Sequence, residues 1–309
     1  MLANFLNKSK PINFIGLLVF FFVNFFALLF IDFYKGGFSA SLLIERLIFA
    51  PIFLLIFFLI NFILAKNKLT FDNSYAFFFF IVFSILILNE VMSLRILLLQ
   101  VVYLLFLRKI YSLRSPKKTI EKVYDGGFWL GIFFILEPTF FSLLFLLYLA
   151  IYLHKRLTVN TLIIPILGFS TPLLVYFAYL FWYDNTELFL ELFQFPTHFS
   201  LSMVSDGKFY IPFLVIVFSA IASIVLKSSK ALAISNSFRR NWILIIVNLL
   251  LSVVFISSKK TIVFNEFMYL LFPISIVIAN GIEMLPKNSF KNTVLYFFLV
   301  GCFVVQFFL

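Results

Sequence analysis

The sequence predicts an all-α integral membrane protein, a polytopic transmembrane helical bundle of about 10–11 membrane helices with a short broken hairpin near residues 127–153. Of the 309 residues, 63% are hydrophobic and only 12% are charged, and the mean hydropathy is +1.12. A soluble domain carries about 25% charged residues. This chain therefore has too few polar side chains to cover a water-exposed surface, which excludes a soluble enzyme. We expect residues 1–309 to form a single integral membrane domain with no soluble domain.

Apolar runs follow one another along the whole chain. A membrane-spanning helix needs about 20 apolar residues, and a lipid-exposed backbone must satisfy its own hydrogen bonds, so we expect the runs to be helices. Tyrosine and tryptophan near many run ends are typical of membrane interfaces. The first run lacks a cleavage signal and is expected to be a retained signal anchor. The runs are 11–31, 47–65, 75–89, 92–107, 127–153, 160–183, 210–227, 241–256, 264–284 and 293–309.

Phenylalanine is unusually frequent, with 49 residues and an unbroken run from Phe77 to Phe80. We interpret such runs as lipid-facing side chains and not as an aromatic binding site. Close helix packing is predicted elsewhere, at Gly127 and Gly131, because small residues four positions apart let two helices approach in lipid.

Motifs for metal or cofactor binding do not occur in the sequence. Cys302 is the single cysteine, so an internal disulfide is excluded, and no Cys and His cluster suggests a metal site. The glycines at 126, 127 and 131 do not form a nucleotide loop, because no strand precedes them and no Lys-Ser/Thr follows. The sequence therefore indicates no metal and leaves any cofactor unknown.

The run 127–153 decides the topology. Pro138 biases Glu137 away from helical dihedral angles, so we expect two short helices that meet there. The chain has 24 basic residues. If both ends of this hairpin lie on the inner side of the membrane, 18 of the basic residues are inside and six are outside. The six outside are Lys35, Arg46, Arg95, Lys208, Lys259 and Lys260. A single crossing would leave the two sides nearly balanced. The positive-inside rule favours the hairpin, with the N-terminus in the cytoplasm and the segment 184–209 external.

The segment 108–122 is the most basic part of the chain. In the favoured topology it is a cytoplasmic loop. Its charges fix the orientation of the neighbouring spans, or they contact anionic or phosphorylated lipid headgroups.

Charged groups at membrane depth are costly, so they are candidates for function. The candidates are the predicted catalytic acids Asp32, Glu90 and Glu137 and the predicted substrate-binding residues Arg46, Arg95 and Glu266. The topology sends them to the external side. We expect the three catalytic acids and Arg95 to approach one another in a partly hydrated, external-facing cavity, because pairing or shared water offsets part of the cost. The alternative is that water and headgroups solvate each charge separately at the interface.

Several motifs between Phe71 and Pro172 resemble those of a family of uncharacterised multi-span inner-membrane proteins of flavobacteria and related Bacteroidota. They are the Arg95 turn, the basic segment 108–122, Asp125-Gly126-Gly127-Phe128-Trp129-Leu130-Gly131, Glu137-Pro138, His154-Lys155-Arg156 and Gly168-Phe169-Ser170-Thr171-Pro172. The resemblance covers about a third of the chain. It implies the bacterial inner membrane and no established activity.

A more distant similarity is to GT-C type glycosyltransferases, which use polyprenyl phosphates, and to polysaccharide polymerases. Those proteins also place a glycine-bearing short helix before a polar-Pro break. The resemblance implies an essential acid in the first external loop, and Asp32 is the residue that matches. The sequence departs from that pattern because Asp32 has no adjacent second acid and no large external domain follows.

Three functions are compatible with these features. A GT-C-like enzyme would act on a lipid-linked sugar at the external face, with a carboxylate base and an arginine near the lipid phosphate. A transporter or lipid flippase would use the broken hairpin as a discontinuous element. A non-catalytic membrane subunit of a cell-envelope assembly would pack against partner spans. The expected partners are therefore membrane lipids, a lipid-linked sugar or partner membrane subunits, and no nucleic acid.

Overall fold

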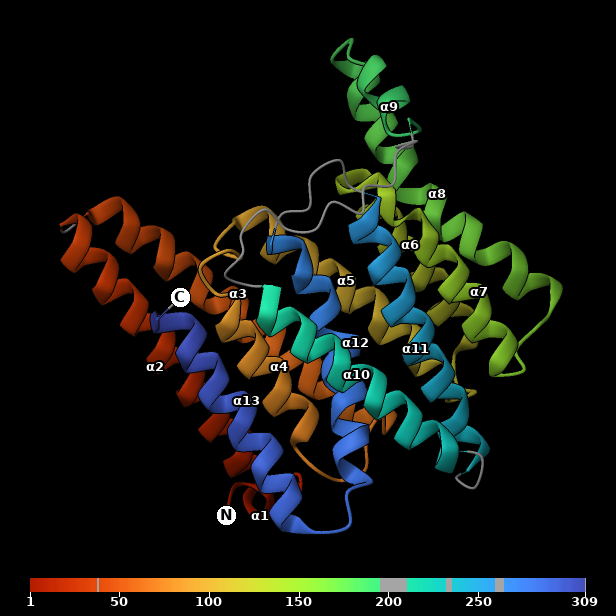
Figure 1. Cartoon of the computed structure of the whole chain (residues 1–309). Helices are drawn as coiled ribbons and strands as arrows, with labels where there is room; N and C mark the ends of the chain where they lie inside the picture. The colour runs from red at the N-terminus through yellow and green to blue at the C-terminus, as the bar shows by residue number, and fades with distance from the viewer. Residues whose placement is uncertain (38, 195–209, 232–234, 259–263, 309) are drawn as a thin grey trace. The chain divides into compact units, whose positions relative to one another are not determined.

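A computed structural model describes residues 1–37, 39–194, 210–231, 235–258 and 264–308 (Figure 1). No β-strand occurs within these ranges, so the predicted all-α class is confirmed. The expected external segment 184–209 lies outside the described residues from position 195 onward.

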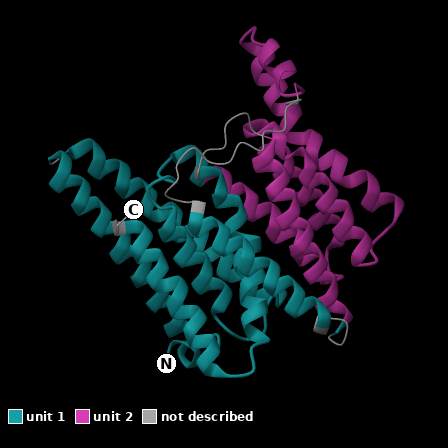
Figure 2. Cartoon of the chain, viewed as in Figure 1, with its two compact units in different colours: residues 1–97, 204–235, 263–309 teal, residues 98–203, 236–262 magenta. Residues whose placement is uncertain are grey.

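The chain divides into two compact units (Figure 2). Unit 1 combines Met1–Leu97, Val204–Ser235 and Val263–Leu309, and unit 2 combines Leu98–Met203 and Asn236–Ile262. Both units are built from helices where the structure describes them. The expectation of a single integral membrane domain stays a prediction.

Seven helices among the described residues are long and apolar enough to cross a membrane. They are Pro11–Gly36, Ala40–Asn67, Val159–Trp182, Ile211–Ser229, Asn236–Ser257, Asn265–Glu283 and Asn288–Gln306. Many of their large apolar side chains are exposed, for example Val175 at 68% and Trp182 at 82%. Exposed apolar surface of this extent is unstable in water and is typical of contact with lipid. The protein is therefore a multi-span membrane protein.

Unit 1 has two central helices. Its elements are α1 (Leu2–Leu6), α2 (Pro11–Gly36), α3 (Ala40–Asn67), α4 (Tyr75–Leu86), α10 (Tyr210–Ala231), η3 (Phe264–Phe267), α12 (Met268–Glu283) and α13 (Asn288–Phe308). Helix α4 contacts α2, α3, α12 and α13, and α12 also contacts α10. Nearly every side chain of α4 and α12 is consequently buried. The prediction that Phe77 to Phe80 face lipid is wrong, because these rings are only 0–3% exposed inside the core.

One end of unit 1 gathers segments that the predicted topology places on a single side of the membrane. The N–H of Ala3 donates to Asn292 Oδ1 at 2.7 Å, and the Tyr75 hydroxyl donates to the carbonyl of Ala3 at 3.2 Å. The amide of Asn280 donates to the carbonyl of Leu69 at 3.1 Å. These bonds join α1, the connection between α3 and α4, the end of α12 and the start of α13. The predicted sidedness of these segments stays a prediction.

Unit 2 contains the broken hairpin. Its elements are α5 (Leu94–Ser112, from Leu98 onward), α6 (Thr119–Leu136), η1 (Pro138–Ser142), α7 (Leu143–Leu153), α8 (Val159–Trp182), α9 (Glu187–Glu191) and α11 (Asn236–Ser257). Glu137 interrupts the hairpin with φ −153° and ψ 87°, and the 3-10 helix η1 begins at Pro138. The predicted break is therefore confirmed.

The first arm of the hairpin is longer than the sequence predicts. Helix α6 begins at Thr119, inside the basic segment 108–122, and α5 extends to Ser112. The basic segment is thus two helix ends joined by a short turn, and not one loop. Its Lys122 side chain donates to the carbonyl oxygens of Ser112 and Ser115 at 2.8 and 3.0 Å, which ties the first turn of α6 to the end of α5.

Helices α6 and α8 pack backbone to backbone (Figure 1). A Cβ atom at Gly127 would lie 2.2 Å from the carbonyl oxygen of Pro165, and one at Gly168 would lie 2.2 Å from that of Tyr124. Gly131 continues the same contact one turn further along α6. The close packing predicted at Gly127 and Gly131 is confirmed, and α8 contributes a third glycine to it.

Candidate functional site

The predicted site residues are divided between the two units. Unit 1 contains Asp32, Arg46, Glu90, Arg95 and Glu266, and unit 2 contains Glu137. The approach of Glu137 to the other residues therefore stays a prediction.

Asp32 and Arg46 form an ion pair near the α2–α3 connection. The Nη2 atom of Arg46 donates to Asp32 Oδ2 at 2.9 Å, and the side chains are 13% exposed for Arg46 and 38% for Asp32. The Nη1 atom of Arg46 is buried and has no hydrogen-bond partner among the described residues. The guanidinium therefore neutralises the acid and keeps a donor for a further acceptor.

The other predicted residues of unit 1 lie on separate elements. Glu90 is half-buried in the turn between α4 and α5, where its N–H donates to the carbonyl of Ile87 at 3.1 Å. Arg95 is exposed in the first turn of α5, and Glu266 is half-buried in η3. Their convergence with Asp32 stays a prediction.

Glu137 lies at the hairpin break and accepts a hydrogen bond from the Thr139 hydroxyl at 3.1 Å. Phe140 of η1 anchors the break in the interior of unit 2. Its ring stacks on Phe255 of α11 with a centroid distance of 3.5 Å and lies 6.3 Å from the ring of Tyr103 on α5. The break is thus packed against α5 and α11.

A polar stripe runs between these two helices and consists of Gln100, Tyr103, Asn248 and Ser252. All four residues are 0% exposed. The Tyr103 hydroxyl donates to Asn248 Oδ1 at 2.9 Å and lies 3.4 Å from the Ser252 hydroxyl. Neither the Nε2 nor the Oε1 atom of the Gln100 amide has a hydrogen-bond partner in the described part of the chain. An unsatisfied buried amide costs about 1–3 kcal/mol, so a hydrogen bond from a polar ligand to the Gln100 amide would be favourable.

Sequence reasoning missed the polar stripe. Each member is a single polar residue inside an apolar run, where hydropathy averages conceal it. The signal that was present is the spacing: Gln100 and Tyr103 are three positions apart, and Asn248 and Ser252 are four apart, so each pair shares one helix face.

A cationic cluster, formed by Arg114, Lys122, Arg156 and Arg240, acts on His154 at one end of unit 2. His154 follows the last residue of α7 and is only 4% exposed. Burial lowers the pKa of His154 most, and the positive charges of Arg240, Arg156, Arg114 and Lys122 add to this effect in that order, so that together they bring it to about 4. The imidazole is therefore neutral at physiological pH. Lys122 lies in the first turn of α6 and His154 follows α7, so they come from the two ends of the hairpin. The expectation that both ends face the cytoplasm stays a prediction.

A buried ion pair lies at one end of the unit 1 core, between α10 and α12. Lys227 of α10 donates to Glu283 Oε2 at 2.8 Å, and the side chains are 0% and 4% exposed. The other carboxylate oxygen accepts from the N–H of Phe71 at 2.9 Å and from the amide of Asn73 at 2.6 Å. Sequence reasoning missed this pair because its partners come from distant runs. Its fully satisfied carboxylate fits a structural role.

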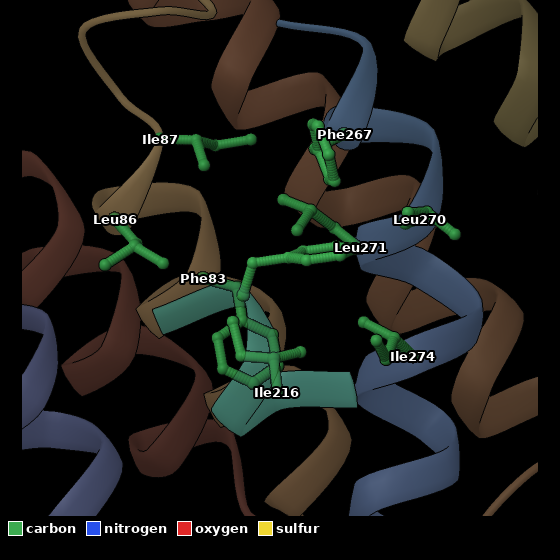
Figure 3. Close-up of a pocket in the computed structure, with 9 residues that line it drawn as sticks. Phe83, Leu86, Ile87, Ile216, Phe267, Leu270, Leu271 and Ile274 are labelled. Atoms are coloured by element: carbon green, nitrogen blue, oxygen red, sulfur yellow. The ribbon is translucent and has the colours of Figure 1, made fainter. Parts of the chain in front are cut away.

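A pocket of unit 1 offers no polar chemistry. Figure 3 shows its lining, in which Phe83, Leu86, Ile216 and Phe267 are representative. The lining side chains are all apolar and suit a hydrocarbon group. Among the residues that the structure describes, no group of three or more His, Cys, Asp or Glu side chains is placed to hold a metal ion.

Comparison with known proteins gives a family and no activity. No solved structure and no curated protein matches the chain. A protein-family model described as "Family of unknown function (DUF6427)" matches residues 1–309.

Proposed function

We propose that this chain, which belongs to the DUF6427 family of unknown function, moves a polar-headed amphiphile across the membrane through unit 2. The observation that carries the proposal is the buried polar stripe beside the broken hairpin. Intramembrane polar groups are costly and mark substrate pathways, and discontinuous helices are a recurring part of transporters.

The stripe has the chemistry that a passing headgroup needs. Gln100 presents an amide donor and an amide acceptor, both without partners in the described residues. The apolar pocket of unit 1 lacks such groups. A headgroup that loses water on entering lipid would exchange those hydrogen bonds for bonds to the stripe, while its acyl chains stay in the bilayer.

The proposal predicts transport by the purified protein. In proteoliposomes that carry a fluorescent short-chain phospholipid, the full chain is expected to speed exchange of the probe between leaflets, measured by chemical quenching of the outer leaflet. Replacing Gln100 with leucine is expected to slow exchange by about tenfold or more, because the headgroup loses hydrogen bonds worth about 1–3 kcal/mol.

A matched control distinguishes transport from stability. Asn24→Leu removes a buried amide of α2 that donates to the carbonyl of Phe20 in its own helix, and it should leave exchange unchanged. Gln100→Leu should unfold no earlier than the wild type, because it removes unsatisfied groups. Wild-type exchange equal to that of protein-free liposomes would contradict the proposal, and the non-catalytic envelope subunit would then lead.

The proposed setting is the bacterial inner membrane with the N-terminus in the cytoplasm. The positive-inside rule supports this orientation, because the cationic cluster and the N-terminal end of unit 1 both belong to the side predicted as cytoplasmic. In a Cys302→Ala background, a cysteine at the exposed position Asn185 should react with an impermeant reagent added outside intact cells, and one at Lys117 should be protected. The opposite pattern would reverse the orientation.

A second candidate is GT-C-like glycosyl transfer from a lipid-linked sugar at the external face. The Asp32–Arg46 pair favours it, because a carboxylate and a guanidinium with a spare donor lie together at the predicted external end of α2. Such a pair could serve an acceptor hydroxyl and a lipid phosphate. Loss of a lipid-linked sugar product in an Asp32→Asn strain, with Gln100→Leu unaffected, would favour the enzyme over the transporter.

A further inference from the structure

A second apolar cavity of unit 1 lies between α10 on one side and α4 and α13 on the other. Its volume is about 240 Å³, and its described lining comes from these three helices. Phe83 and Ile216 also line the pocket of Figure 3. Phe297 and Phe298 are shared with a further groove between α10 and α13. The three spaces therefore adjoin one another along the first half of α10.

The chemistry of the lining excludes water as the occupant of this cavity. Its described lining consists of apolar residues, Gly301 and Cys302, and the Cys302 thiol already donates to the carbonyl of Val82 at 3.2 Å. A buried water molecule needs two to four polar partners, whereas an apolar cavity of about 150 Å³ is known to stay dry and to bind a small apolar molecule. The larger cavity of unit 1 therefore suits a hydrocarbon group.

Helix α10 is held in place by contacts outside the cavity. A Cβ atom at Gly281 of α12 would lie 2.2 Å from the Ser223 hydroxyl oxygen, so α10 and α12 approach each other closely there. One turn further along α10, Lys227 pairs with Glu283 of α12 at 2.8 Å. Helix α10 cannot shift to fill the cavity without breaking these contacts. An empty space of this size forfeits the dispersion contacts of its lining, so an apolar occupant is favourable.

The cavity opens onto the surface that faces lipid. Ile211 of α10 and Phe297 and Val304 of α13 belong to its lining, and all three side chains are exposed at that surface. Along α13 the cavity and the adjoining groove extend from Val294 to Val305, which is roughly 16 Å at 1.5 Å per residue. This length is about half of a hydrocarbon layer of about 30 Å, and thus matches the depth of one leaflet.

We propose that this cavity binds one acyl chain of a membrane phospholipid, inserted sideways between α10 and α13. The apolar lining, the opening toward lipid and the length of one leaflet identify the ligand. On the predicted topology the lipid belongs to the external leaflet, where α13 ends. The site lies within unit 1, so it goes beyond the transport proposed for unit 2 and does not depend on it.

The test titrates phosphatidylcholine into the delipidated full chain in detergent and counts bound lipid by native mass spectrometry. One tightly bound lipid per chain is expected. Gly301→Phe should lower its affinity by about tenfold or more, because the burial of two methylene groups already corresponds to about that factor. A Cβ atom at Gly301 meets no described atom within 4 Å, so the ring enters open space.

Thermal unfolding separates loss of binding from loss of folding. Without lipid, Gly301→Phe should unfold no earlier than the wild type, because the ring fills the cavity and glycine is a poor helix former. Added phosphatidylcholine should raise the unfolding temperature of the wild type and leave that of the variant unchanged. An equal rise in both proteins would contradict the site.

Val300 supplies the matched control. It is adjacent on α13, exposed, and does not belong to the described lining, so Val300→Phe adds the same ring outside the cavity. Its lipid affinity should equal that of the wild type. Equal weakening by both substitutions would mean general contact with lipid and would overturn the site, as would full affinity in Gly301→Phe.

Cross-linking locates the bound chain. With one phosphatidylcholine per protein and a diazirine on its acyl chain, cross-links are expected on lining residues of α4, α10 and α13, such as Phe298 and Ile216. Cross-links confined to unit 2 would contradict the proposal. Displacement of the phospholipid by an equimolar polyprenyl phosphate would assign the cavity to an isoprenoid and overturn the acyl chain.

Discussion

Unit 2 is expected to lose its stable packing when Gly127 is replaced by alanine. The new Cβ atom would lie 2.2 Å from the carbonyl oxygen of Pro165, which is backbone and cannot move aside without shifting α8. Overpacking typically costs about 1–3 kcal/mol, and a clash with backbone on this scale belongs at the upper end or beyond. Thermal unfolding in detergent, followed by size-exclusion chromatography, measures the loss.

The neighbouring glycine provides the control. A Cβ atom at Gly126 would meet the tip of the Leu147 side chain at 3.2 Å, and that side chain can rotate. Alanine also favours a helix over glycine by about 1 kcal/mol, so Gly126→Ala should be close to neutral. Equal unfolding temperatures for the two variants would show that the backbone contact between α6 and α8 does not set the packing of unit 2.

The second large effect is expected at the buried pair of Lys227 and Glu283. Lys227→Met leaves the Glu283 carboxylate buried with no counter-ion from Lys227, and removal of one partner from a buried pair typically costs about 3–5 kcal/mol. The amide and N–H donors of Asn73 and Phe71 remain, but they do not supply a positive charge. The free energy of unfolding in mixed micelles measures the change.

The double variant Lys227→Met, Glu283→Gln should recover much of that loss, because a neutral amide needs no counter-ion and its oxygen still accepts from Phe71. Lys118→Met is the surface control. Its pair with Glu121 is exposed at 73% and 61%, so the change should be small. A double variant no more stable than Lys227→Met alone would mean that packing of the lysine stem, and not its charge, stabilises this end of unit 1.

Local signals in the sequence predicted the features that depend on local physics. Runs of apolar residues predict helices because lipid forces the backbone to bond within itself. Pro138 predicts the break because its ring excludes helical dihedral angles at Glu137. Gly127 and Gly131 predict a close helix contact because of their spacing, although the partner Gly168 follows only from the fold.

Features that depend on which helices are neighbours could not be predicted. Hydropathy does not distinguish a ring that faces lipid from one that faces protein, so it predicts the wrong environment for Phe77 to Phe80. The pairing of Lys227 with Glu283 joins two distant runs, and neither run alone indicates it. The Asp32–Arg46 pair is different, because a short connection between two helices brings its members together.

The central place of α4 has a consequence for the order of biosynthesis. Twelve residues make a helix of roughly 18 Å, short against a hydrocarbon layer of about 30 Å, so α4 is poorly suited to stay in lipid alone. Its main partner α12 begins at Met268, and the intervening stretch, which includes all of unit 2, takes roughly 10–40 s to synthesise at about 5–20 residues per second. Until translation is nearly complete, the nascent chain therefore contains the phenylalanine-rich helix α4 without α12, which packs against it in the folded protein. This intermediate is the form of the chain that membrane quality control would encounter before folding is complete. A ribosome that stalls before Met268 would leave α4 without its partner α12.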